Sequence, residues 1–206
     1  MLICLILLFI GGQFEFPELS DAPLLSLRCG QAIRPYIASD LTEMDAISPL
    51  EILVDSPIVQ LKIDGASPID LGSEKDPKGT VVVSIDGQTV AQGIVPLNTT
   101  KASLPLTLRS LNPQAGAYNL TCSLTYGDQT FTATSTLTYL PDPGAETGSV
   151  TKMDMRTGAL LARPPSGEGP YQRVFPVGFY TNFGSYLSQN LSVIAELKDQ
   201  GCVHIC

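Results

Sequence analysis

The chain has 206 residues, of which 12 are Lys or Arg and 20 are Asp or Glu, so its formal net charge at pH 7 is -8. Apolar residues make up 44% of the chain and charged residues 16%, which is sufficient apolar material for a folded core. This balance excludes nucleic-acid binding, because phosphate contacts need clustered Lys and Arg and the sequence has no basic run.

The N-terminus is an apolar run, Met1 to Ile10, which ends at Gly11-Gly12. The run is shorter than the roughly 20 apolar residues that a membrane-spanning helix needs, but it has the length of the apolar region of a secretory signal. We therefore predict a signal peptide over residues 1–12 and an extracellular protein. A buried strand is the alternative interpretation, and a retained leader would instead anchor the protein at a membrane.

Three N-glycosylation sequons agree with export, and they begin at Asn98, Asn119 and Asn190. Such triplets also arise by chance in Thr-rich sequence. Together with the leader, however, they favour an extracellular glycoprotein.

Four of the five cysteines remain after the leader is removed. A disulfide between Cys29 and Cys122 suits an oxidising compartment. Buried free thiols fit the sequence almost as well, and four cysteines allow three pairings that sequence alone does not distinguish.

Residues 13–140 are predicted to form an antiparallel β-sandwich, with the clearest strand signals from residue 50 onward. Short stretches of alternating apolar and polar residues follow one another without a helical period between them. Asp86-Gly87 lies between two such stretches and predicts a hairpin, because a type I′ turn needs residues that tolerate a positive φ. In the stretch 118–125, alternation places Asn119 on the solvent face and Cys122 on the core face.

The segment from Leu111 to Cys122, which reads Leu-Asn-Pro-Gln-Ala-Gly-Ala-Tyr-Asn-Leu-Thr-Cys, resembles the late-strand motif of immunoglobulin-like and fibronectin-like modules. In those modules a tyrosine hydroxyl at the start of the strand bonds back to the main chain, and the resemblance gives Tyr118 this part. The chain departs from the antibody pattern, because it has no Trp and its Cys122 lies four residues after the Tyr. The resemblance therefore implies a general Ig-like antiparallel β-sandwich.

The C-terminal part is predicted to contain a linker over residues 141–149, a hairpin and a βαβ unit. The hairpin pairs residues 150–155 with 159–162 around Arg156-Thr-Gly. A strand over 173–180, an amphipathic helix over 186–200 and a strand over 202–206 then follow with short joins. Strands joined in this way are normally parallel.

Three segments of this part resemble the opening of (β/α)8-barrel glycoside hydrolases, namely Thr157-Gly-Ala-Leu-Leu, Phe175-Pro-Val-Gly-Phe-Tyr and Glu196-Leu-Lys-Asp-Gln-Gly with His204 beyond it. Those families often carry a β-sandwich before the barrel. Their catalytic carboxylates lie on later strands, and residues 150–206 supply fewer than two of the eight strands that a TIM barrel has. The resemblance implies the non-catalytic module and barrel start of a secreted carbohydrate-active protein, with no catalytic residue and no cofactor.

The alternative function is a stand-alone extracellular Ig-like module for binding or adhesion, with cell-wall or extracellular polysaccharide as its partner. If the barrel resemblance holds, Tyr180 and Asn182 lie where the first strand reaches the active-site face. They would then form a sugar subsite by stacking and hydrogen bonding, although a core residue and a loop residue are the simpler interpretation. The segment Cys202-Val-His-Ile-Cys206 lacks a fourth zinc ligand, so we predict no metal site.

Overall fold

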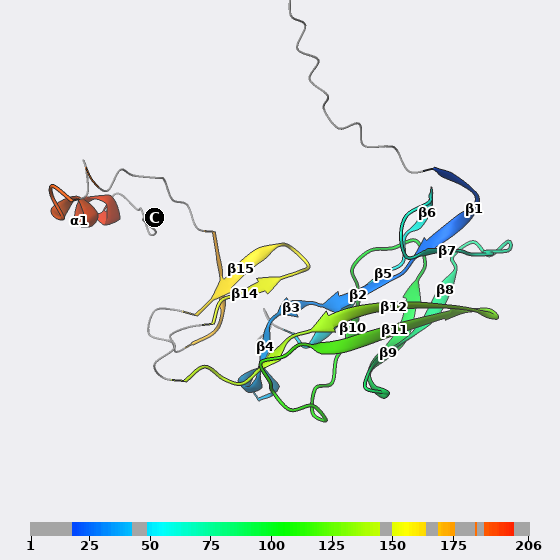
Figure 1. The fold of residues 1–206 in the computed structure, drawn as a ribbon, viewed down its shortest axis with the longest axis horizontal. Coiled ribbons are helices and arrows are strands. Elements are labelled where there is room, and N and C mark those ends of the chain that lie inside the picture. The colour runs from blue at the N-terminus through cyan, green and yellow to red at the C-terminus, as the bar shows by residue number, and fades with distance from the viewer. Residues whose placement is uncertain are drawn as a thin grey trace, which may run out of the picture. The chain divides into compact units, whose positions relative to one another are not determined.

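The computed structural model describes residues 18–42, 49–144, 150–163, 169–175, 184 and 188–199 (Figure 1). The chain forms two compact units, each assembled from separated segments. Unit 1 takes residues 1–30, 52–106 and 119–136, and unit 2 takes residues 31–51, 107–118 and 137–206. The sequence predicted one β-sandwich over residues 13–140 followed by a separate C-terminal part. In the structure, residues 31–51 and 107–118 instead belong to the same unit as the C-terminal part.

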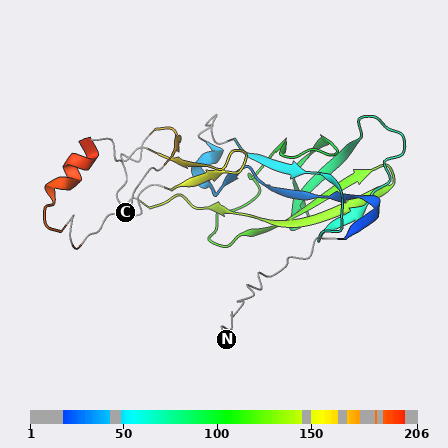
Figure 2. The same cartoon turned by 90° about the horizontal axis from the view of Figure 1, so that it is seen from above.

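Unit 1 is built from antiparallel strands. Some of these strands run one residue past the limits of the unit. In chain order they are β1 (Leu19–Ser26), β2 (Arg28–Gln31), β5 (Glu51–Asp55), β6 (Ile58–Leu61), β7 (Ala66–Pro68), β8 (Lys78–Ile85), β9 (Gln88–Pro96), β10 (Ala102–Pro105), β11 (Tyr118–Tyr126) and β12 (Gln129–Leu137). They form three sheets with the orders β6-β1-β7, β10-β5-β2 and β12-β11-β8-β9. Strands β11 and β12 run side by side as a long hairpin in both views (Figures 1 and 2). This arrangement confirms a mainly β, sandwich-like chain.

The core of unit 1 follows the period-two pattern of the sequence. Strands β8 and β11 turn alternate apolar side chains inward, and these residues are at most 1% exposed: Val81, Val83, Ile85, Leu120, Cys122 and Leu124. The register of β8 and β11 places Cys122 opposite Val83 and Leu124 opposite Val81. Full burial of each branched aliphatic side chain contributes about 1.5–3 kcal/mol, so the alternation fixes which face becomes the core.

The β8–β9 hairpin turns at Asp86 and Gly87, as predicted. The φ angles are 48° at Asp86 and 78° at Gly87, the positive values that a type I′ turn requires at both central positions. The sequence prediction for this turn is confirmed.

Unit 2 contains two smaller sheets and an α-helix. Its elements are β3 (Ile33–Arg34), β4 (Tyr36–Ile37), the 3-10 helix η1 (Ala38–Leu41), β13 (Tyr139–Leu140), β14 (Lys152–Asp154), β15 (Ala159–Ala162), β16 (Gln172–Val174) and α1 (Ser192–Asp199). Strand β13 pairs with β4 in parallel, and β16-β15-β14-β3 form an antiparallel sheet. The β14–β15 pairing confirms the hairpin predicted around Arg156-Thr-Gly, and Gly158 supplies a φ of 77° in its turn.

The end of the chain agrees only in part with the predicted βαβ unit. The described part of the strand expected over 173–180 is β16, which pairs antiparallel with β15, and helix α1 lies within the predicted 186–200. Phe175 falls within the strand predicted over 173–180, which is wrong at this residue, because β16 ends at Val174 and the Phe175 side chain is 88% exposed. The leader, residues 176–183 and the strand predicted over 202–206 lie outside the described residues.

Among the helices that the structure describes, none has the length and apolar character to span a bilayer.

Candidate functional site

The disulfide of strand β11 identifies the inner face of the β11–β12 hairpin, and the opposite face is exposed. Cys29 in β2 and Cys122 in β11 are joined by a disulfide, with their Cα atoms 6.4 Å apart and a sequence separation of 93. The disulfide between Cys29 and Cys122 that suits an oxidising compartment is therefore present, while Cys202 and Cys206 lie outside the described residues. Because Cys122 points inward, its neighbours on β11 at odd positions point outward.

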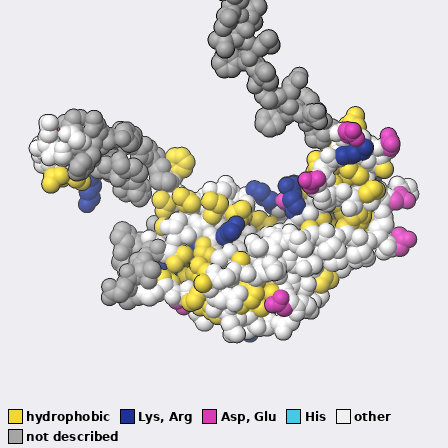
Figure 3. All heavy atoms as spheres, in the orientation of Figure 1, with side chains coloured by type: hydrophobic (Ala, Val, Ile, Leu, Met, Phe, Trp, Pro, Cys, Tyr) yellow, Lys and Arg dark blue, Asp and Glu magenta, His cyan; other side chains and the backbone are white. Residues whose placement is uncertain are grey.

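The outward positions of β11 and β12 carry short neutral polar side chains. Strand β12 buries Phe131 and Leu137, and its alternate residues are exposed threonines: Thr130, Thr132, Thr134 and Thr136. Strand β11 presents Asn119, Thr121 and Thr125 to solvent in the same way. In Figure 3 the surface over these strands is largely white, the colour of neutral polar side chains and backbone.

A shallow groove lies on this hairpin at the end away from its turn. Its volume is about 480 Å³, and its lining residues come in two triplets from the two strands: Asn119, Leu120 and Thr121, and Thr134, Ser135 and Thr136. The short turn at Gly127 and Asp128 joins the strands, which brings these triplets beside each other. The groove therefore depends on local hairpin geometry within unit 1.

The outward side chains of the groove are the carboxamide of Asn119 and the hydroxyls of Thr121, Thr134 and Thr136. Between them lie Leu120 and Ser135, whose side chains point to the inner face of the hairpin. Each of the outward groups both donates and accepts hydrogen bonds, which suits a neutral ligand with many hydroxyls. The lining has no titratable side chain. General acid–base catalysis, and glycoside hydrolysis in particular, needs positioned carboxyl groups, so the groove suits binding and not hydrolysis.

The three predicted sequons have different surroundings. Asn98 has a φ of 56°, and its Oδ1 accepts a hydrogen bond from the Ile58 N–H at 3.1 Å. Asn190 accepts hydrogen bonds on its Oδ1 from both the N–H and the Oγ of Ser192, at 3.1 and 2.7 Å, just before α1. Asn119 stands exposed on a regular strand at the groove.

Tyr118 makes a hydrogen bond back to the main chain upstream of its strand. Its hydroxyl donates a hydrogen bond to the carbonyl oxygen of Asn112, six residues upstream, in unit 2. This contact fixes the loop before β11 against the start of that strand. The expected hydrogen bond back to the main chain is therefore present.

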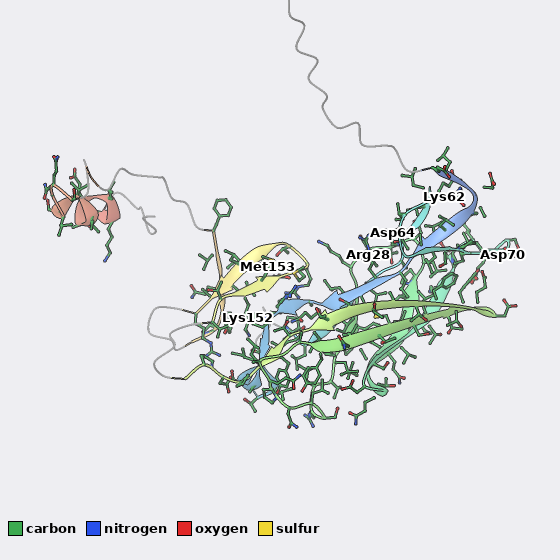
Figure 4. All side chains as sticks on the ribbon, in the orientation of Figure 1. Arg28, Lys62, Asp64, Asp70, Lys152 and Met153 are labelled. Atoms are coloured by element: carbon green, nitrogen blue, oxygen red, sulfur yellow. A yellow bond between two sulfur atoms is a disulfide. The ribbon has the colours of Figure 1, made fainter. Side chains whose placement is uncertain are left out.

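A second cluster of polar side chains is buried inside unit 2. The Nζ of Lys152 donates to the Oδ1 of Asp40 at 2.5 Å, and the two side chains are 0% and 6% exposed. The same Nζ lies 4.0 Å from the ring centroid of Tyr171. Lys152 and Met153 are neighbours on β14 (Figure 4), and it is the charged residue that is buried while Met153 is 41% exposed.

Asp154 and Arg156 add a second ion pair to this cluster. Arg156 donates from Nε to Asp154 Oδ1 at 2.8 Å and from a terminal nitrogen to Oδ2 at 3.1 Å, and its backbone N–H also bonds Oδ1. Burial alone would raise the pKa of Asp154, but these bonds from Arg156 outweigh it and hold the pKa below its usual value. Asp154 is therefore ionised at neutral pH.

Tyr36 links three backbone groups in unit 2. Its hydroxyl donates to the carbonyl oxygens of Glu51 and Pro49, at 2.9 and 3.1 Å, and accepts from the Glu51 N–H at 3.0 Å. Burial of the side chain raises the pKa of Tyr36 to about 12. The neutral hydroxyl is thus part of the packing of unit 2, and we assign this cluster to stability.

Sequence reasoning missed the Asp40–Lys152 pair. The one signal for it was the triplet Lys152-Met153-Asp154, in which alternation puts two charges on one face of a strand and a methionine on the other. Tyr180, Asn182, Cys202, His204 and Cys206 lie outside the described residues. Within the described ones, no group of His, Cys, Asp and Glu has the arrangement of a metal site.

No protein-family model, curated protein or solved structure matches this chain.

Proposed function

We propose that this chain is the non-catalytic β-module and barrel start of a secreted, glycoside hydrolase-like, carbohydrate-active protein. The observation that carries the proposal is the β14–β15 hairpin, which β16 follows in the chain and pairs with along β15. The barrel-type hydrolases that the sequence resembles have a hairpin at the same point, between the β-sandwich and the barrel. The Tyr118 corner supports the Ig-like character of the preceding strands. The Cys29–Cys122 disulfide is compatible with secretion, since disulfides persist in oxidising compartments.

The role of such a module is to support a catalytic domain. The groove on β11–β12 offers hydroxyls and a carboxamide, and hydrolysis of a glycosidic bond requires a pair of acids across the sugar. We therefore expect the chain itself to release no sugar from polysaccharide.

The coding sequence beyond Cys206 tests the parent architecture. The proposal expects a continuing reading frame with alternating strands and helices, and with Glu or Asp directly after later strands. A stop codon after Cys206, with no such sequence in the same transcript, would overturn the barrel part of the proposal.

A second candidate function is polysaccharide binding by the sandwich-like unit alone. The neutral, hydroxyl-lined groove favours it, although the groove presents no aromatic ring on which a sugar could stack. Co-sedimentation of the unglycosylated protein with insoluble neutral polysaccharides tests this candidate. Binding that disappears in the Thr134→Val/Thr136→Val variant would support it, and no binding to any polysaccharide would remove it.

A further inference from the structure

Asn119 is distinguished from the other two sequons by how its carboxamide is placed. The side chain of Asn98 accepts a hydrogen bond from the N–H of Ile58, 40 residues away in the sequence, and that of Asn190 accepts two from nearby Ser192. Within the described residues, no hydrogen bond involves the side chain of Asn119. It is the second residue of β11, and the sequon hydroxyl of Thr121 lies on the same exposed face.

The groove beside Asn119 is an open depression with room for a sugar and with hydrogen-bonding groups along it. Its volume of about 480 Å³ falls within the roughly 300–1,000 Å³ that small-molecule sites occupy. One wall is the sequon itself, and the other carries the outward hydroxyls of Thr134 and Thr136. A sugar attached at Asn119 would therefore begin at the rim of a groove lined with hydrogen-bonding groups.

We propose that an N-linked glycan on Asn119 lies in this groove, with its first sugars on Thr134 and Thr136. In the attachment step, Asn119 Nδ2 forms a bond to C1 of the first sugar. The bond from C1 to the lipid diphosphate of the donor breaks, the diphosphate leaves with the electron pair, and Nδ2 loses one proton. The donor is the lipid-linked oligosaccharide of the secretory pathway, so the inference rests on the secretion in the proposed function.

A tethered glycan suits this groove better than a free polysaccharide does. The hydroxyl contacts are individually weak, and the lining offers no aromatic face for stacking. Attachment at Asn119 raises the effective concentration of the sugar to about the millimolar range, which makes weak contacts sufficient. The glycan would then cover the polar outer face of β11 and β12 beside an edge of their sheet.

The experiment uses the full chain, secreted from a eukaryotic host behind that host's own signal peptide, so that it does not depend on the native leader. Glycopeptide mass spectrometry measures occupancy at each sequon, and peptide-N-glycosidase applied to the native protein measures the rate of glycan release. We expect Asn119 to be occupied and its glycan to be released more slowly than those of Asn98 and Asn190. Thr134→Val/Thr136→Val should speed its release roughly fivefold for each hydrogen bond lost.

The matched control is Thr130→Val/Thr132→Val, on the same face of the same strand but outside the groove lining. It should leave the release rate at Asn119 unchanged. Valine is favoured in strands, so both variants should fold. As a second readout, Asn119→Gln should speed amide exchange in peptides covering 134–136.

An unoccupied Asn119 would overturn the inference. Equal release rates in the groove variant and the control variant, or unchanged exchange in Asn119→Gln, would also overturn it. Failure of the native leader to direct export, tested separately, would count against the proposed function and not against the glycan site.

Discussion

The two units of the molecule are stabilised by different kinds of interaction. Unit 1 follows the rule of alternating strands, with apolar side chains inside, neutral polar ones outside and a disulfide at Cys122 in its core. Unit 2 reverses the rule on β14, where Lys152 and Asp154 are buried and Met153 is exposed. The fold of unit 1 therefore follows mostly from the alternation of apolar and polar residues, whereas unit 2 also depends on particular buried polar partners.

Removal of one member of the buried ion pair should have the largest effect. Lys152→Met leaves the carboxylate of Asp40 buried without its cation, which should lower the free energy of unfolding by about 3–5 kcal/mol. Chemical denaturation measures this change.

The matched control is Lys62→Met, which breaks the exposed pair with Glu18, whose side chains are 57% and 80% exposed. It should cost less than about 1 kcal/mol. The double variant Lys152→Met/Asp40→Asn should lose less stability than Lys152→Met alone, because it removes the uncompensated charge. Equal losses in the two lysine variants would show that the buried pair has no special role.

Loss of the disulfide should be the next largest effect. Cys29→Ala/Cys122→Ala removes a cross-link between positions 93 residues apart, and such losses typically cost about 2–5 kcal/mol. A reducing agent should destabilise the natural chain and leave the double variant unchanged in thermal unfolding. If the reducing agent acts equally on both, another cysteine accounts for the effect.

Alkaline pH should destabilise unit 2 through Tyr36. Because burial raises the pKa of Tyr36 to about 12 in the folded chain, against an ordinary value of 10.0, its contribution is complete below pH 10 and is lost as the pH rises through 12. The full shift corresponds to about 3 kcal/mol.

Denaturant unfolding at increasing pH, with Tyr36→Phe as the comparison, measures how much stability the ionisation of Tyr36 removes. The natural chain should lose more stability between pH 10 and pH 12 than the phenylalanine variant. Parallel curves for the two proteins would contradict the assignment of the raised pKa to Tyr36.

The Tyr118 corner should give the smallest effect. Tyr118→Phe keeps the ring and removes only the hydrogen bond to the Asn112 carbonyl, so we expect a loss of about 1 kcal/mol. Thermal unfolding measures the difference. An unchanged midpoint would mean that the corner contributes nothing to stability.

Local patterns in the sequence predicted the hairpins and the faces of the strands. The turn at Asp86-Gly87 depends on the backbone preferences of two adjacent residues, and the outward position of Asn119 depends only on alternation. The same alternation on β12 makes its threonines exposed, so part of the candidate groove could be anticipated from the sequence.

The contacts that were missed join residues far apart in the chain. Asp40 lies in a stretch without regular strand signals, and it meets Lys152 across 112 residues. The parallel pairing of Tyr36 with Tyr139 likewise joins two segments that lie far apart in the sequence. Neither contact follows from periodicity, because both depend on which segments the complete fold brings together.

Hydrogen exchange followed by mass spectrometry, with and without a reducing agent, tests most directly whether the two units are held by different forces. We predict that reduction of the Cys29–Cys122 bond raises exchange in peptides covering β2, β8 and β11, while peptides covering β14 and β15 keep their protection. Equal loss of protection in both sets of peptides would show that the disulfide stabilises the two units alike.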